Sequence, residues 1–263
     1  MESEKIKIRV TSFTFISMLR AEHYKAKNNL SILLVLLCPL VTIMGRYISS
    51  VRRSLAGTMP EEMSAINFWI SFARDLIPLY VFYPLLVSLL AYSLCDMEYR
   101  NHSFRRLFTL PYSFRVIFAS KIVFLTEIVF ASSLIAYLSF MSSNILPGLP
   151  LQDYDARLAC FYFHFRLFIG LLAVSFIQLG ISLAFRNFFI PIGFACFMTA
   201  LSTALYMITE SVLSPFVSGF QALLDFAHYQ SVSLSKYEYA SLAVIFVFLF
   251  IDFFLFRRQK TAI

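Results

Sequence analysis

Charged residues are scarce in this 263-residue sequence, where Asp, Glu, Lys and Arg together make up 14%. A soluble domain carries roughly 25% charged and about 45–50% apolar residues, whereas 59% of this chain is hydrophobic. The balance excludes a soluble globular enzyme as the default class. It also excludes a disordered chain, which would be poor in apolar residues. With 31 phenylalanines to face lipid, the sequence predicts a polytopic membrane protein.

Cysteine and glycine are also rare, with 4 and 7 residues. Four scattered cysteines are too few for a disulfide framework or a zinc site. The glycines lie too far apart for a phosphate-binding G-x-x-x-x-G-K-[ST] loop, and neither H-E-x-x-H nor G-x-S-x-G occurs. We therefore expect no catalytic residue, metal site or cofactor in this chain.

Long uncharged runs are the dominant pattern. A helix needs about 20 predominantly apolar residues to cross the hydrocarbon core of a bilayer, and six runs come close to or exceed that length. We predict an all-α membrane protein with a single transmembrane domain over residues 30–256. Its six transmembrane helices would cover 30–48, 76–95, 116–142, 160–185, 188–209 and 239–256.

A seventh uncharged run, 211–224, is too short to cross a bilayer and contains Pro215 and Gly219. Runs of about 10–14 residues are typical of re-entrant or interfacial segments. We predict a helix–break–helix there, that is, a re-entrant hairpin between the fifth and sixth spans.

The distribution of lysine and arginine predicts the orientation of the spans. Fifteen of these residues fall on the segments that would face one side, and six fall on the opposite loops. Because basic loops stay in the cytoplasm, we expect a cytoplasmic N-terminal segment, 1–29, and a cytoplasmic basic tail, 257–263. The basic residues form no single patch, so we do not expect a nucleic-acid partner. The bilayer is the expected environment.

The segment between the second and third spans shows a short amphipathic pattern. Met97, Phe104 and Phe108 share one helical face, and Pro111 would end the helix. Asp96 and Glu98 suit a helix N-terminus. We predict a short cytoplasmic helix around residues 98–108. The alternative is a plain interfacial connector with a cluster of basic residues.

Several segments resemble the permeases of type-2 ABC exporters, and most closely the lantibiotic-immunity and bacitracin-resistance subfamily. One match begins at Glu98, continues through the basic pair Arg105 and Arg106, and leads to a Thr-Leu-Pro-x-Ser run and a lysine. A second lies before the first span and a third around the fourth and fifth spans. The matching segments are Thr109-Leu110-Pro111-Tyr112-Ser113, Ser120-Lys121, Ala21-Glu22-His23-Tyr24-Lys25-Ala26-Lys27, Ile177-Gln178-Leu179-Gly180-Ile181-Ser182 and Arg186-Asn187-Phe188-Phe189-Ile190-Pro191-Ile192-Gly193.

The resemblance implies a bacterial plasma-membrane permease that exports a hydrophobic or amphiphilic substrate, such as an antimicrobial peptide. An elbow helix on the cytoplasmic surface would lie within residues 10–29. ATP and Mg would bind a separate ATP-binding cassette subunit, and a second copy or a related permease would complete the transporter. The contact with that subunit would involve Met97, Glu98, Phe104, Arg105, Arg106, Phe108 and Pro111, with the charged side chains at the rim of the contact.

Ionisable and amide side chains inside the spans are costly and by default functional. Glu127 would lie near the midplane, either on the transport path or as a protonated group between helices. Arg166 would either snorkel outward or pair with an acidic group of the loop 211–238. Asp252 would pair with the nearby Arg257 and Arg258, and Gln178 would be a path residue or a hydrogen-bonding contact between helices.

Two other functional classes remain open at this stage. The chain could be an intramembrane enzyme that uses Glu127 or Asp252 with a histidine, or a membrane scaffold subunit without a transport role. Stimulation of a co-purified ATPase separates the permease from both alternatives.

Overall fold

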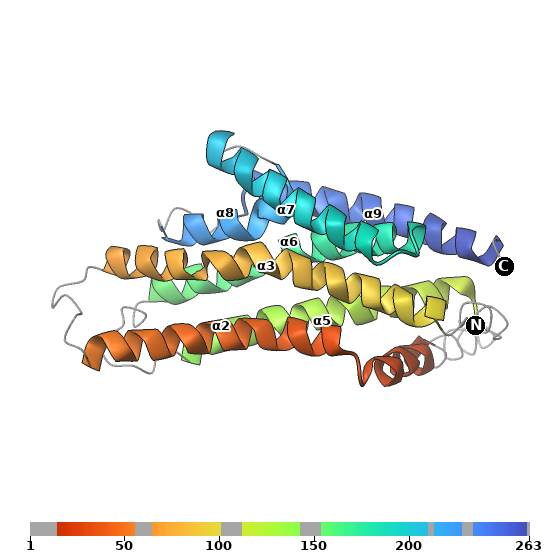
Figure 1. Cartoon of the computed structure of the whole chain (residues 1–263), viewed down its shortest axis with the longest axis horizontal. Coiled ribbons are helices and arrows are strands. Elements are labelled where there is room, and N and C mark those ends of the chain that lie inside the picture. The colour runs from red at the N-terminus through yellow and green to blue at the C-terminus, as the bar shows by residue number, and fades with distance from the viewer. Residues whose placement is uncertain are drawn as a thin grey trace, which may run out of the picture.

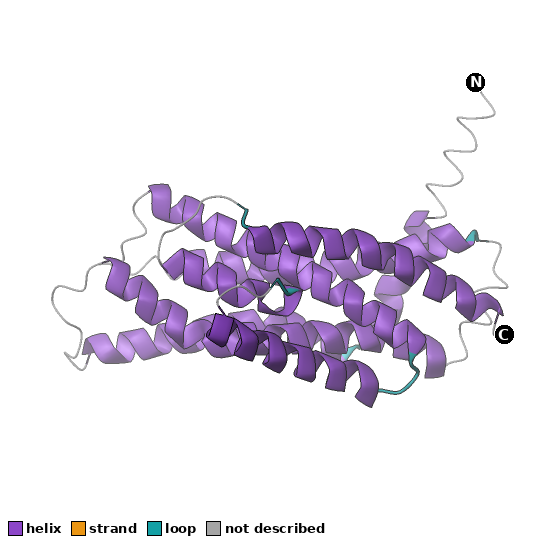
Figure 2. Ribbon diagram, turned by 90° about the horizontal axis from the view of Figure 1, so that it is seen from above, coloured by secondary structure: helices purple, strands orange, loops and turns teal. Residues whose placement is uncertain are grey.

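The computed structural model describes residues 15–55, 65–100, 112–142, 154–209, 213–227 and 234–261, and all the regular structure in these ranges is helical. The first helix covers residues 15–26. The others are α2 (Leu30–Leu55), α3 (Ala65–Arg100), α5 (Phe114–Ser142), α6 (Tyr154–Ala184), α7 (Phe189–Thr209), α8 (Pro215–Ala227) and α9 (Lys236–Thr261). They form an elongated bundle in which the helix 15–26 and the C-terminal end of α9 lie at the same end (Figures 1 and 2).

Each of the six predicted spans lies on one of the six longer helices, with an overhang of at most one residue. Four of these helices, α5, α6, α7 and α9, contain an apolar stretch long enough to cross a membrane within the described residues. In α2 the apolar stretch, Leu30–Val41, is shorter. Membrane crossing by α2 and α3 therefore stays a prediction.

Helix α6 is the centre of the bundle. It packs against α3, α5, α7, α8 and α9, and 78% of its apolar stretch is buried, against 22–33% for the other three candidate spans. Gly170 allows α6 and α8 to approach closely, because a Cβ atom there would lie 1.8 Å from the Ser218 Oγ of α8. A central helix with five neighbouring helices explains why most residues of the apolar stretch of α6 are buried.

Helix α7 carries its small and polar residues on the inside. Its buried face consists of Pro191, Ala195, Thr199, Ser202 and Tyr206, whereas Phe189, Phe197, Leu201, Met207 and Ile208 are exposed. Small residues let helices approach closely in a bilayer, where lipid covers the large apolar side chains. This arrangement is the one expected of a helix at the lipid-facing surface of a bundle.

Helix α8 corrects one prediction. The chain forms one unbroken helix over Pro215–Ala227, which continues through Gly219, so the predicted helix–break–helix is not found in these residues, and the re-entrant hairpin stays a prediction. Pro215 begins the helix, where its missing N–H costs nothing, and the Ser214 Oγ accepts a hydrogen bond from the Phe216 N–H at 3.4 Å. Helix α8 packs on α6 and α3. It lies away from the C-terminal end of α9 (Figure 1).

The end of α3 corrects a second prediction. Asp96, Met97 and Glu98 lie in the last turns of α3, which continues to Arg100, so the acidic pair does not begin a separate short helix. Residues 101–111 lie outside the described residues, and with them the predicted contact residues Phe104, Arg105, Arg106, Phe108 and Pro111. Only the two ends of this segment are described, at Arg100 and from Tyr112 into α5.

Candidate functional site

Four charged side chains from three helices meet where α3 ends, and we call them the four-charge cluster: Glu22, Lys25, Glu98 and Lys121. The Lys121 Nζ lies 2.8 Å from the Glu98 Oε1 and 3.1 Å from the Glu22 Oε2. The Lys25 Nζ lies 2.7 Å from the Glu98 Oε1 and 3.1 Å from the Glu22 Oε1. Each carboxylate therefore contacts both ammonium groups, and the cluster is neutral as a whole.

The four-charge cluster is buried. Glu22 and Glu98 are each 1% exposed and Lys121 is 5% exposed, whereas the side chain of Lys25 is 30% exposed. Burial by itself would raise the pKa of Glu98, but Lys121 and Lys25 outweigh it and lower that pKa to about 2. Glu98 is therefore ionised at neutral pH, and it does not sit at the exposed rim of a partner contact as the sequence suggested.

The local sequence explains why these charges need one another. Glu22 and Lys25 are three residues apart and so share a face of the first helix. Glu98 lies in the last described turn of α3 and Lys121 about two turns into α5, and each would be a costly buried charge without a partner from another helix. Pairing across the helices offsets both penalties. The cluster thus ties the helix 15–26 to the two helix ends that flank residues 101–111.

Sequence reasoning named Glu98 as a site residue but not Glu22, Lys25 or Lys121. The signal was present, because all four belong to segments that resemble the exporter permeases. What was missing was their proximity: Glu22 and Lys121 are 99 residues apart, and helix assignment alone does not place such residues in contact.

A second buried cluster surrounds Arg166 of α6, which is 2% exposed. Its Nη2 lies 2.6 Å from the Asp225 Oδ2 of α8, and its Nε lies 2.9 Å from the Glu238 Oε1 of α9. The prediction that Arg166 snorkels outward is therefore wrong, and the alternative pairing with the loop 211–238 and its ends is right. Arg166 lies on the side of α6 that faces α8 and α9, so its guanidinium contacts acidic partners there and does not extend to the surface.

This arginine cluster also fixes the start of α9. Glu238, 0% exposed, accepts hydrogen bonds from the Ser235 N–H at 2.7 Å and from the Ser235 hydroxyl. The Ser235 Oγ in turn accepts a bond from the Tyr237 N–H. Ser235 and Glu238 form a capping box, in which a serine and an acidic residue three positions later satisfy the first N–H groups of a helix. One arginine therefore holds α6, α8 and α9 together.

Glu127 pairs with a histidine. Its Oε2 lies 3.2 Å from the His23 Nε2, and the side chains are 42% and 53% exposed. The His23 ring also packs edge-on against Phe124, with ring centroids 4.8 Å apart. Glu127 thus faces the first helix on the outside of α5. A role on the transport path stays a prediction.

Asp252 corrects a further prediction. It is 0% exposed, and among the described residues neither of its carboxylate oxygens has a hydrogen-bond partner. Arg257 and Arg258 are exposed and lie five and six residues further on, about 140° and 240° around the helix, so neither shares its face. Asp252 packs instead against Gly180 of α6, where a Cβ atom would lie 2.4 Å from the Asp252 Oδ1.

Gln178 is likewise 0% exposed. Within the described part of the chain its amide nitrogen and oxygen have no hydrogen-bond partner. Among the described residues, Gln178 therefore does not make the hydrogen bond between helices that the sequence led us to expect. A path role for Gln178 stays a prediction.

Replacing Gly180 with alanine should destabilise the packing of α6 on α9, because the new methyl group would overlap Asp252. Overpacking typically costs about 1–3 kcal/mol, and the better helix propensity of alanine, worth about 1 kcal/mol, offsets part of that cost. The matched control is Gly193→Ala in α7, where no atom lies within 4 Å of the new Cβ. Thermal unfolding in detergent should show a lower midpoint for Gly180→Ala only. Equal midpoints for the two variants would show that the contact with Asp252 is not close.

Comparison with known families assigns the chain to one of them. The sequence profile of the ABC-2 family transporter proteins matches residues 18–202, which is more than half of the chain and includes the four-charge cluster. The chain therefore belongs to the ABC-2 family of transporter proteins, the membrane components of ABC transporters. No curated protein sequence and no solved structure matches it significantly.

Proposed function

We propose that this chain is the permease subunit of an ABC exporter, with six spans and both termini in the cytoplasm. A separate ATP-binding cassette subunit would bind ATP and Mg, and a second copy or a related permease would complete the transporter in the bacterial plasma membrane. The substrate is a hydrophobic or amphiphilic molecule, such as an antimicrobial peptide. Family membership favours this function over an intramembrane enzyme or a scaffold subunit.

The observation that carries the proposal is the position of the four-charge cluster. Residues 101–111 are flanked by the end of α3 and the start of α5, and the cluster joins both ends to the helix 15–26 through Glu98, Lys121 and Glu22. A push by the ATP-binding subunit on residues 101–111 would reach three helices through these ion pairs. Because packed helices have discrete alternative arrangements, such a push would switch the bundle between inward-open and outward-open states.

Loss of an aromatic contact in the segment 101–111 should detach the ATP-binding subunit. Losing a buried aromatic anchor at an interface costs about 2 kcal/mol or more, whereas a charge at the rim costs less. We expect Phe104→Ala or Phe108→Ala to reduce co-purification of the ATP-binding subunit strongly, and Arg106→Ala to reduce it mildly. Full co-purification with both phenylalanine variants would remove this segment as the docking site.

The proposed orientation predicts which residues a membrane-impermeant thiol reagent can reach in intact cells. In a chain whose four native cysteines are replaced by serine, we expect Ser103→Cys and Thr261→Cys to be labelled only after the cells are opened. The distribution of lysine and arginine is the physical reason. Labelling of either position in intact cells would contradict six spans with cytoplasmic termini.

A further inference from the structure

Helix α2 contains a proline in its interior, Pro39. Proline has no N–H group to donate to the carbonyl four positions earlier in a helix, here that of Val35, and its ring crowds that carbonyl. Sharp bends in helices are found mainly at such positions. Val35 is buried, so its carbonyl needs a donor from another part of the protein.

Ser132 of α5 supplies that donor. Its hydroxyl donates a hydrogen bond to the Val35 carbonyl oxygen at 2.6 Å, and the Tyr83 hydroxyl of α3 contacts the same Oγ. Because the single hydroxyl proton of Ser132 goes to the carbonyl, the Tyr83 hydroxyl donates to the Ser132 Oγ. All three residues are at most 1% exposed. We call this chain of two hydrogen bonds the Ser132 latch, and it joins α2, α3 and α5.

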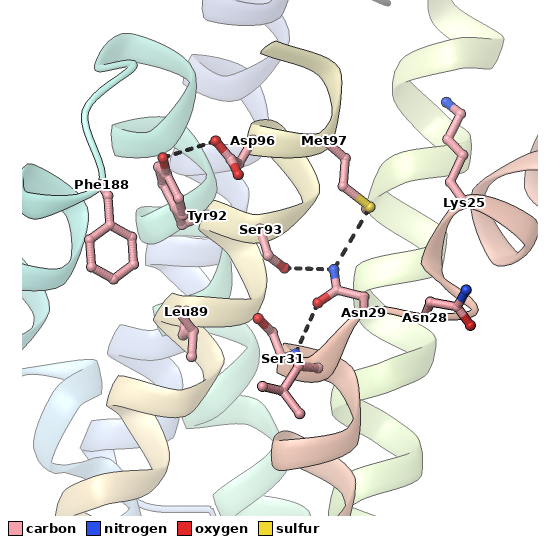
Figure 3. A pocket seen from close by; sticks show the side chains of 11 residues that line it. Lys25, Asn28, Asn29, Ser31, Leu89, Tyr92, Ser93, Asp96, Met97 and Phe188 are labelled. Carbon is pink, nitrogen blue, oxygen red and sulfur yellow. Dashed lines mark hydrogen bonds between the residues drawn. The ribbon is translucent and has the colours of Figure 1, made fainter. Parts of the chain in front are cut away.

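A cavity of about 390 Å³ lies next to the half of α2 that precedes Pro39 (Figure 3). Leu30, the first residue of α2, lines the cavity, and so does Phe188, directly before α7. Leu89 and Tyr92 of α3 contribute further lining. This half of α2 therefore has room to move on the side of Phe188.

The turn before α2 is attached to α3 by exchangeable contacts. The Asn29 Nδ2 donates a hydrogen bond to the Ser93 Oγ at 3.0 Å, and it lies 3.8 Å from the Met97 Sδ (Figure 3). A neutral side-chain hydrogen bond at a partly buried site is readily exchanged for one with water. The Ser132 latch, in contrast, is fully buried, so it is the contact that fixes the position of this part of α2.

From these observations we infer that the first half of α2, residues 30–38, is a movable arm that pivots at Pro39, and that the Ser132 latch holds it in the position seen here. Release of the latch lets the arm close over the cavity toward Phe188. The arm follows the helix 15–26 after a short turn, so the pivot lets this end of the chain move while the second half of α2 stays in place. The inference rests on the proposed function for the force that moves the arm.

Thermal unfolding in detergent tests the latch. Ser132→Ala leaves a buried carbonyl and a buried phenol without their partner, and it should lower the unfolding midpoint by about 2–4 °C or more. The matched control is Ser133→Ala, because the Ser133 hydroxyl donates to a carbonyl of its own helix, and its effect should be smaller. Pro39→Ala restores the missing N–H, so Ser132→Ala should cost less in that background. An equal loss in both backgrounds would overturn the inference.

Distances between spin labels test the movement of the arm. In a chain whose native cysteines are replaced by serine, one pair of labels is placed at Leu33→Cys in the arm and Phe189→Cys in α7, and a control pair at Ile48→Cys and Phe189→Cys; all three positions are exposed. We expect Ser132→Ala to add a population with a shorter 33–189 distance and to leave the 48–189 distance unchanged. An unchanged 33–189 distribution, or the same change in both pairs, would overturn the inference.

Both measurements use the full chain without the ATP-binding subunit, so their outcome is independent of the proposed function. A chain that stimulates the ATP-binding subunit, but whose 33–189 distance does not respond to Ser132→Ala, overturns the inference alone. A chain whose arm moves in the Ser132→Ala variant, but whose wild-type form gives no stimulation, overturns the export function alone.

Discussion

Replacing Lys121 with methionine should strongly destabilise the folded chain, since it leaves two buried carboxylates, Glu22 and Glu98, with Lys25 as the remaining cation of the cluster. Removing one partner of a buried ion pair costs about 3–5 kcal/mol. For a chain of this size that corresponds to a fall in the unfolding midpoint on the order of 10 °C. Thermal unfolding of the purified chain in detergent measures it.

Two further variants show whether charge is the cause. Lys236→Met makes the same substitution at an exposed lysine and should leave the midpoint nearly unchanged. Adding Glu98→Gln to Lys121→Met restores neutrality, and it should recover part of the loss rather than add to it, as coupled neighbours do. Additive losses in the double variant would show that Lys121 and Glu98 do not interact.

Arg166→Met should have an effect of similar size in a different part of the bundle. It leaves Asp225 and Glu238 without the guanidinium that contacts both, and uncompensated buried charges cost about 3–5 kcal/mol. We expect a midpoint lower by on the order of 10 °C. The unfolding midpoint of Arg166→Lys should lie between those of the wild-type chain and Arg166→Met. Lysine keeps the charge, but an ammonium cannot reproduce the geometry of the guanidinium fork.

The control for Arg166 is Arg52→Met, at an exposed arginine of α2. Adding Asp225→Asn to Arg166→Met removes one of the stranded charges and should raise the midpoint again. If the double variant unfolds at a lower temperature than Arg166→Met, the loss comes from packing around the arginine and not from its charge.

The helices were predictable because their signal is local. The uncharged runs predicted the positions of all six longer helices, but the charged residues that bound those runs predicted the ends of the helices poorly. Helix α3 begins at Ala65 and therefore includes Asp75, the residue directly before the predicted second span, 76–95. A helix can continue past a charge into the interface or the solvent, so the limits of a hydrophobic run underestimate the length of the helix.

The charge clusters were less predictable, because their pairing is not local. Arg166 and Glu238 are 72 residues apart, and Lys121 and Glu98 contact each other only because the ends of α3 and α5 are neighbours. Proximity in the sequence misled at Asp252, whose nearby arginines lie on other faces of α9. The useful signal was the presence of charges of opposite sign near the ends of different spans, and only the packing of the helices shows which of them meet.

In the function proposed above, this chain transmits the energy of ATP hydrolysis, which occurs on another subunit, to a membrane bundle. The most direct test is the rate of ATP hydrolysis by the cognate ATP-binding subunit in nanodiscs, measured with and without this chain. We predict a severalfold higher rate with the wild-type chain and the basal rate with Phe108→Ala. An ATP hydrolysis rate that is the same with the wild-type chain, with the variant and with neither would contradict the account.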